Sequence, residues 1–263
     1  MNKFILHSNI LSLTLELREI YSNLRLNDCE DLLDKLSDIL IQNMGLNRSQ
    51  FSINIPAFDY TPFNNPNISV SQNNTSFALA RRIFKFLSRD KFDIYWDPVF
   101  SLISYPGTGK TLNHNENNYF PFVSGSTILN KNSFLIFTKD AFQLSNIMQA
   151  EIEYFNDKHP YRRSKKFIFN NLDLNKKIEF NYWVRPRNEL ANYDLNNLYN
   201  LLIKNEIAKP LEPSSIYYLS YESLFNFIST NLANDPFFLL SLDSKLKIVE
   251  SFVDKKVPNY LFL

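Results

Sequence analysis

The sequence predicts a mixed fold of the α+β or α/β class, in which an N-terminal helical pair is followed by a mixed sheet with repeated strand–helix units. Three observations indicate this class. Apolar residues recur at helical spacing before residue 45, short aromatic runs typical of strands begin at residue 91, and one strand-to-helix pattern occurs more than once. With 263 residues, of which 44% are hydrophobic, the chain can bury a sizeable core.

The helical pair is predicted at residues 9–26 and 28–44. Both segments carry leucine and isoleucine at the spacing of one helix face. Asn27 or Asp28 can cap the start of the second helix, and Gly45 stands where a left-handed C-terminal cap belongs. We therefore expect two successive amphipathic helices, the second of which ends at the glycine.

Three regions are expected along the chain. Residues 1–55 form an N-terminal helical region, and residues 56–74, rich in proline and asparagine, form an irregular linker. Residues 75–263 form an α/β domain with possible internal repeats, opened by a short basic helix at 75–89.

The repeated pattern occurs at residues 134–141, 216–223 and, more loosely, 237–244. Each copy has an apolar strand, then Ser or Thr, any residue, an acid and a small residue. The hydroxyl can cap the following helix, and the acid lies at the positive end of the helix dipole. A generic strand-to-helix junction and a true duplication both explain the pattern. Further strands are expected at 92–104, 119–124, 166–170 and 179–185, and helices at 139–156, 188–205, 220–232 and 242–255.

The run from Pro106 to Thr111 resembles the end of a phosphate-binding loop, because Gly109, Lys110 and Thr111 match its last positions. The first glycine of that motif is replaced by Ser104, and the residues after Thr111 are rich in asparagine. We therefore expect a hairpin turn between strands near 98–104 and 119–124, with a degenerate nucleotide-binding loop as the alternative.

No catalytic or metal-binding set is expected, and no cofactor is implied. The single cysteine, Cys29, falls on an apolar helix face and is expected to be buried. Glu151 and Glu153 lie two positions apart on a helix, so they point to different faces, and we expect both to be solvated. The three histidines are scattered: His7, His114 and His159.

One dense basic cluster offers a candidate nucleic-acid surface. With a nearby tryptophan it comprises Arg162, Arg163, Lys165, Lys166 and Trp183. These side chains could contact phosphates and stack on bases, although a solvated loop explains the charge run as well. With 28 basic and 27 acidic residues the whole chain is nearly neutral, so nucleic acid is not an expected partner.

The composition also bears on location. Asparagine, isoleucine and lysine are abundant beside 24 phenylalanines and 14 tyrosines, while there are only 4 glycines. The abundant residues have A/T-rich codons, which is typical of an organelle genome, an intracellular bacterium or a large DNA virus. No apolar run is long enough to span a membrane, and the start has no signal or transit character. We expect a soluble protein that stays in the compartment of its synthesis.

The run 134–142, which enters a helix through Asp-Ala, and the Pro-Val-Phe strand at 98–103 resemble segments of the Tic intermembrane-space family, the small soluble component of the chloroplast import machinery. The resemblance covers residues 98–263. It implies a soluble α/β protein that chaperones preproteins, located in a plastid and without catalytic residues.

These expectations combine into one hypothesis for function. The chain is expected to be a non-enzymatic plastid protein that acts as a chaperone, assembly or protein-transport factor and has other proteins as partners. The alternatives are a degenerate nucleotide-binding protein using Gly109, Lys110 and Thr111, and an RNA-associated factor using the basic cluster.

Overall fold

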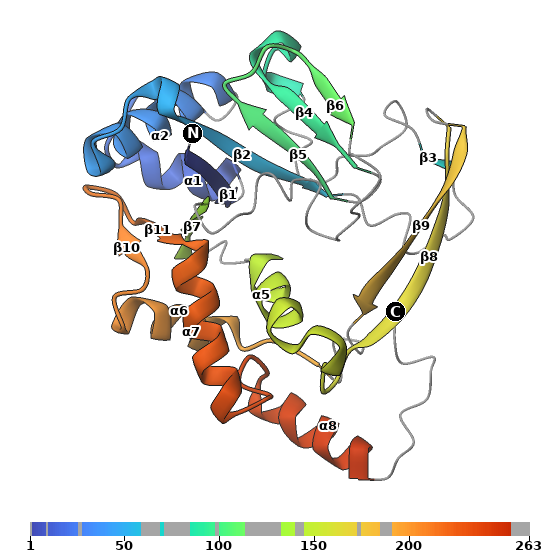
Figure 1. Cartoon of the computed structure of the whole chain (residues 1–263). Coiled ribbons are helices and arrows are strands. Elements are labelled where there is room, and N and C mark those ends of the chain that lie inside the picture. Colours follow the sequence, from blue (N-terminus) through green and yellow to red (C-terminus); the bar gives the residue numbers. More distant parts are fainter. Residues whose placement is uncertain are drawn as a thin grey trace.

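The computed structural model describes residues 2–8, 10–25, 28–58, 69–70, 85–97, 100–113, 133–139, 145–172, 175–184 and 191–253. Within these ranges a large mixed sheet and a smaller sheet are packed with helices (Figure 1), so the expected mixed α/β class is confirmed. No helix in these ranges is long and apolar enough to span a bilayer.

The large sheet has eight strands among the described residues, in the order β10-β11-β7-β1-β2-β5-β4-β6. Their bounds are β1 (Asn2–His7), β2 (Phe51–Phe58), β4 (Asp93–Trp96), β5 (Phe100–Tyr105), β6 (Thr111–Asn113), β7 (Ser133–Thr138), β10 (Lys209–Pro210) and β11 (Ile216–Ser220). The second sheet contains β3 (Ser69–Val70), β8 (Arg163–Asn171) and β9 (Lys176–Val184). The helices in the described part are α1 (Ile10–Arg18), α2 (Cys29–Met44), α5 (Ser145–Phe155), α6 (Leu195–Lys204), α7 (Tyr221–Asn234) and α8 (Leu242–Val253), and short 3-10 turns cover Arg48–Gln50, Arg89–Lys91 and Asn156–Lys158.

Strand β1 is the central element of the large sheet. It pairs in parallel with β2 on one side and with β7 on the other. Its apolar run Phe4, Ile5 and Leu6 is at most 2% exposed, as expected for a strand covered on both faces. The sequence pattern predicts no strand at residues 2–7. The structure corrects this prediction by showing a strand there. The strand was not predicted because a short apolar run followed by a helix lacks the alternating pattern of a half-buried strand.

The second helix and its caps are confirmed, whereas the first helix, expected at 9–26, is the shorter α1, which ends at Arg18. The side chain of Asp28 accepts a hydrogen bond from the Asp31 amide, and Gly45 has a φ of 62° with its amide bonded to the Ile41 carbonyl at 3.0 Å. Cys29 is buried on the inner face of α2. These features depend on neighbours in the chain, which is why spacing and cap residues predict them.

The large sheet crosses the expected domain boundaries. Strands β1 and β2, from the expected helical region at 1–55, lie in the same sheet as β5, β7 and β11. The end of β2 also occupies the first positions of the expected linker at 56–74. The rest of that linker, apart from β3, most of the helix expected at 75–89 and the strand expected at 119–124 lie outside the described residues.

The first two copies of the repeated pattern are neighbouring strands, because β11 pairs antiparallel with β7. Ser220 caps α7 as expected, accepting a hydrogen bond from the Ser223 amide. The third copy differs: residues 237–240 form a turn with one bridge, Tyr193 to Leu240. The physical reason is Asp235, whose side chain and carbonyl accept the amides of Phe237 and Phe238 that a strand would have used.

The expected strand at 92–104 is two antiparallel strands, β4 and β5. Strands β8 and β9 form a long antiparallel hairpin that extends away from the large sheet (Figure 1). The elements expected at 166–170 and 179–185 are therefore longer than the sequence indicated, and they belong to a separate sheet.

Candidate functional site at the carboxyl edge of the sheet

The carboxyl ends of two parallel central strands meet at one edge of the large sheet. Strand β1 ends at His7, which lies opposite Phe137 of β7, and β7 ends one residue later at Thr138. Open α/β sheets bind ligands outside the carboxyl ends of their strands. This edge is therefore the first place to look for a functional site.

His7 is held at this edge by a side chain from α5. Its Nε2 atom lies 2.5 Å from Oδ1 of Asn146, and the histidine is 7% exposed. The Asn146 amide is itself oriented, because its Nδ2 donates to Oε1 of Gln149 at 3.3 Å. Since the amide oxygen can only accept, Nε2 of His7 carries the proton and Nδ1 of the neutral ring carries none.

Two hydroxyls join the same strand ends. The Ser8 and Thr138 hydroxyl oxygens lie 2.9 Å apart, immediately after β1 and at the end of β7. Thr138 is fully buried and Ser8 is half-buried, and this hydrogen bond joins the two strand ends. We call His7, Ser8, Thr138 and Asn146 the carboxyl-edge cluster.

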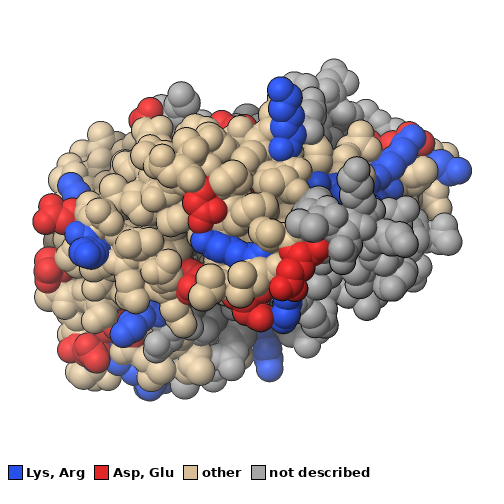
Figure 2. All heavy atoms as spheres, turned by 90° about the horizontal axis from the view of Figure 1, so that it is seen from below, with Lys and Arg blue, Asp and Glu red and all other residues tan. Residues whose placement is uncertain are grey.

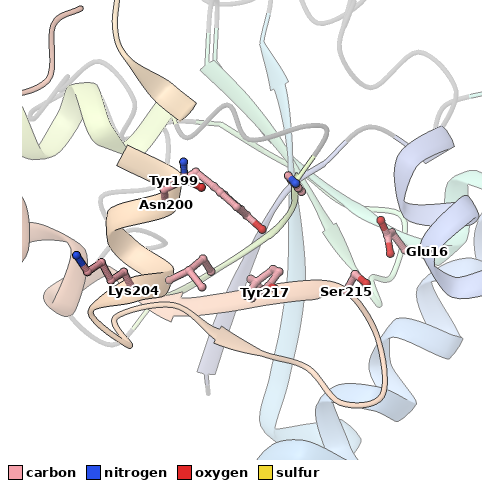
Figure 3. Close-up of a pocket in the computed structure, with 8 residues that line it drawn as sticks. Glu16, Tyr199, Asn200, Lys204, Ser215 and Tyr217 are labelled. Carbon is pink, nitrogen blue, oxygen red and sulfur yellow. The ribbon is translucent and has the colours of Figure 1, made fainter. Parts of the chain in front are cut away.

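A pocket of about 500 Å³ lies at the same edge of the sheet (Figure 3). It is lined by Glu16, Lys139, Tyr199, Asn200, Ile203, Lys204, Ser215 and Tyr217. One wall comes from α6, the opposite side from Glu16 of α1, and the base from the start of β11. Lys139 follows the last residue of β7, so the pocket belongs to the same carboxyl edge.

Aromatic rings form the apolar part of this pocket. The ring of Tyr217 stacks on Phe137 with centroids 6.1 Å apart, and Tyr199 meets Tyr217 edge-on at 5.9 Å. Residues opposite each other in neighbouring strands share a face, so the register of β11, β7 and β1 puts Tyr217, Phe137 and His7 on one face. The pocket and the histidine thus flank the same corner of the sheet.

The glycine-bearing loop at 106–110 crosses the end of β4 rather than forming the expected hairpin. Strand β4 lies between β5 and β6 and pairs with both. Gly107 is required here, since a Cβ atom on it would lie 2.1 Å from the Asp93 amide nitrogen. Gly109 has a φ of +79°, which also favours glycine.

The candidate residues Gly109, Lys110 and Thr111 do not form a phosphate cradle. The amides of Thr108 and Lys110 donate to Oδ1 of Asp93 at 2.8 and 2.9 Å, so a carboxylate already occupies the position that a phosphate would need. Strand β6 starts at Thr111, where a phosphate loop would begin a helix. The loop is a corner of the fold, closed by its own aspartate.

Arg162, assigned above to a nucleic-acid surface, is buried in an ion pair with Glu151. Its Nε donates to Oε2 of Glu151 at 2.8 Å and its Nη1 to the Trp183 carbonyl at 3.0 Å, and both charged side chains are inaccessible. The expectation that Glu151 is solvated is therefore wrong, while Glu153 is exposed on the other side of α5.

Three further side chains complete what we call the Glu151 network. Tyr161 and Tyr193 donate their hydroxyls to the two oxygens of Glu151, the second at 2.5 Å, and Tyr193 also accepts from Arg162. His159 Nε2 lies 3.4 Å from Oε2 of Glu151, while its Nδ1 accepts the Arg162 amide at 3.2 Å. The network links α5 to the start of β8 and to the segment before α6.

Opposing effects set the protonation of this network. Burial alone raises the pKa of the Glu151 carboxyl, but Arg162, His159 and the Tyr193 hydroxyl outweigh it and hold that pKa below its ordinary value. Burial lowers the pKa of His159, and Glu151 only partly opposes this. Near neutral pH, Glu151 and Arg162 are therefore charged and His159 is neutral. The network's role is structural, because its hydrogen bonds hold α5 against the start of β8.

The other residues of the basic cluster are placed differently from one another. Arg163, Lys165 and Lys166 are exposed on β8, and Lys166 pairs with Glu179 of β9 at 2.5 Å. Trp183 is half-buried on β9, opposite Ser164. On the face of the molecule shown in Figure 2, basic and acidic side chains are mixed over a mostly uncharged surface.

The fold resembles a group of solved structures that includes aminoglycoside acetyltransferases. The aminoglycoside acetyltransferase AAC(3)-IVa, in a histidine-to-alanine variant bound to a gentamicin, is 12% identical with a TM-score of 0.53 and covers 93% of this chain and 86% of its own. AAC-IIIb in a binary complex with coenzyme A is 10% identical with a TM-score of 0.54, covering 88% and 90%. YokD from Bacillus subtilis is 11% identical with a TM-score of 0.51, covering 89% and 92%.

This chain has the fold of these acetyltransferases. A scan with protein-family models and a search of curated proteins gave no match. At 8–13% identity the likeness shows the fold alone. It contradicts the expectation of a non-enzymatic chaperone, transport or assembly factor, because the neighbouring structures are those of acetyltransferases rather than import components.

The sequence pattern does not mark His7 and Asn146 as site residues. A local signal existed, since His7 and Ser8 end an apolar run and precede a helix, as polar residues at a strand's carboxyl end do. No local signal connects His7 to Asn146, which lies 139 positions further along the chain. Only the parallel pairing of β1 with β7 brings them together.

Proposed function

We propose that this protein is an N-acyltransferase that moves an acyl group from a coenzyme A thioester to an amine. The observation that carries the proposal is the His7–Asn146 pair at the carboxyl edge of a sheet whose fold is that of aminoglycoside acetyltransferases. One of those neighbours was solved with coenzyme A, and another with an aminoglycoside. A pocket that includes Lys139, the residue after β7, provides room for a ligand at the same edge of the sheet.

The reaction assigns a defined task to His7. The amine nitrogen attacks the thioester carbonyl carbon, a carbon–nitrogen bond forms, the carbon–sulfur bond breaks, and the thiolate of coenzyme A takes up a proton. The amine must lose a proton as it attacks. Nδ1 of His7 can accept it, because Asn146 holds the tautomer in which Nε2 carries the hydrogen.

Transfer from acetyl-coenzyme A to a panel of primary amines tests this proposal. Thiol release is followed with a colorimetric reagent, and the N-acetylated product is identified by mass spectrometry. Loss of a general base costs about 10²–10⁴-fold in rate, so His7→Gln should lower kcat by at least about 10²-fold. Asn146→Ala should lower kcat by less, because the ring remains and only its orientation is released.

His159→Gln is the matched control. It removes a buried histidine that belongs to the Glu151 network and leaves the carboxyl-edge cluster intact. Its kcat should equal that of the wild type under conditions where circular dichroism shows both to be folded. Full activity in His7→Gln would show that His7 is not the general base. No transfer to any amine, together with no calorimetric binding of coenzyme A, would remove the function itself.

The plastid location, the resemblance to the import component and the protein partners expected from the sequence remain predictions beside this proposal. Co-purification from organelle extracts would test the partners and the location.

A further inference from the structure

Helix α8 presents a row of apolar side chains to solvent. Leu242, Leu246 and Val249 are 72%, 57% and 47% exposed, and no other element in the described residues carries as many large exposed hydrophobic side chains. The packed side of the same helix holds Ser244 and Ile248, which are buried. In Figure 1, α8 lies along the lower edge of the molecule. A contiguous apolar row of this kind marks a surface that binds another protein surface.

The spacing of this row is that of a coiled-coil seam. Leu246 follows Leu242 by four positions, and Val249 follows Leu246 by three. Apolar residues at alternating intervals of four and three lie along one line of a helix, where they pack between the side chains of a second helix with the same pattern. We call Leu242, Leu246 and Val249 the α8 seam. Its spacing fits a helix as the partner.

The two flanks of the α8 seam carry opposite charges. Lys245 lies on one flank, where Asp235 of its own chain holds it with an Nζ–Oδ2 distance of 2.6 Å. Asp243 and Glu250 lie on the other flank, and both are exposed. A helix with one basic and one acidic flank is complementary to a second copy of itself.

These flanks also specify the direction of the second helix. In a parallel pair of helices the basic flank of each copy meets the acidic flank of the other, so Lys245 of one copy faces Glu250 of the other copy. In an antiparallel pair, flanks of the same charge meet, and like charges repel. The charges on α8 therefore favour the parallel arrangement.

We propose that two copies of this chain associate through α8, with the two helices parallel and the α8 seam of each copy packed against that of the other. One pair of short helices is a small interface, so the dimer is reversible, with a Kd on the order of 1–100 µM. The proposal is independent of acyl transfer, because α8 contributes no residue to the carboxyl-edge cluster or to the pocket.

Sedimentation velocity of the full chain between about 1 and about 200 µM tests the association. The wild type should change from monomer to dimer over this range. Leu246→Glu should raise the Kd at least about 10²-fold, because it puts a charge in the middle of the α8 seam. Leu15→Glu is the matched control, since Leu15 is 55% exposed on α1, and its Kd should equal that of the wild type.

A charge reversal tests the flanks. Glu250→Lys places lysine opposite Lys245 in both flank contacts of a parallel dimer, so it should raise the Kd about tenfold. Glu212→Lys makes the same change of charge at an exposed position between β10 and β11 and should leave the Kd unchanged. Circular dichroism verifies that each variant is folded.

Cysteine cross-linking tests the direction of the helices. Parallel helices bring residue 242 of one copy beside residue 242 of the other, so Leu242→Cys alone should form a disulfide-linked dimer when oxidised with diamide. The natural Cys29 is buried, so the introduced thiol is the accessible one among the described residues. Antiparallel helices would instead require a mixture of Leu242→Cys with Val249→Cys.

Each result decides the proposal. A wild-type monomer at every concentration would overturn it, and the α8 seam would then face a different protein. A dimer whose Kd is the same in Leu246→Glu would place the interface elsewhere and overturn it as well. A cross-link that forms only in the mixed cysteine sample would overturn the parallel arrangement.

Discussion

Replacing Glu151 by glutamine should destabilise the protein by about 3–5 kcal/mol, because it leaves a buried guanidinium without its counter-charge. Glu151 and Arg162 are both inaccessible, and the carboxylate accepts hydrogen bonds from Arg162, Tyr161 and Tyr193. A glutamine amide keeps the shape of the side chain but removes the charge and turns one acceptor into a donor that faces other donors. The loss of stability is that of leaving a buried charge without a counter-charge, which is larger than the free energy that any single hydrogen bond contributes.

Urea unfolding followed by circular dichroism measures this loss, and a thermal scan should show a fall in Tm of roughly 6–20 °C. Glu153→Gln is the control on the same helix. Glu153 is exposed and accepts one hydrogen bond, from Tyr221 at 2.9 Å, so its replacement should cost less than about 1 kcal/mol. The double variant Glu151→Leu with Arg162→Met should be more stable than Glu151→Gln, because no unpaired charge stays buried. A loss below about 1 kcal/mol in Glu151→Gln would refute the reasoning.

Two other predictions concern acid and the glycine loop. The pKa of Glu151 lies below its ordinary value in the folded state, so its contribution to stability is present above about pH 4.5 and is lost as pH falls through the folded pKa. The pKa of His159 is also depressed, so below about pH 6.5 the unfolded chain takes up a proton before the folded protein does, and the free energy of unfolding falls. Urea unfolding measured between about pH 7 and about pH 4 should show this fall, and His159→Gln should show a smaller fall below about pH 6.5. A free energy of unfolding that does not change with pH would contradict the prediction. Gly107→Ala should cost at least about 1–3 kcal/mol in the same assay, because its Cβ would meet the Asp93 amide nitrogen at 2.1 Å. Gly45→Ala, where a Cβ meets nothing within 4 Å, should cost about 1–2 kcal/mol from its positive φ alone, and equal small losses at both positions would contradict the steric argument.

The sequence pattern predicted most of the helices and their caps. Asp28, Gly45 and Ser220 act within three or four positions of themselves, so their roles can be read from spacing. Strand β1 was missed because a run of only three apolar residues, Phe4 to Leu6, favours a helix or a strand equally. The loop at 106–110 was recognised as a turn, but its path around β4 depends on strand order, which no local pattern encodes.

The two glutamates on α5 show where local reasoning stops. Their spacing predicted different faces, and the structure agrees, since Glu151 is buried and Glu153 is exposed. Which of them turns inward depends on how α5 sits against Tyr161 and Arg162. That arrangement is set by packing between segments. Because of it, Arg162 and Glu151, both expected at the surface, form a buried ion pair.

The sequence by itself determined the class of fold, the caps of its helices and the absence of a complete phosphate-loop motif, because each depends on residues close together in the chain. The tertiary structure decided the likeness to the acetyltransferase fold, the His7–Asn146 pair and the pocket at the same edge of the sheet. His7 and Asn146 are 139 positions apart, and the pocket combines residues of α1, α6 and β11 with Lys139. Parallel pairing of β1 and β7 brings these groups to one edge, and no pattern along the chain specifies which strands will be neighbours.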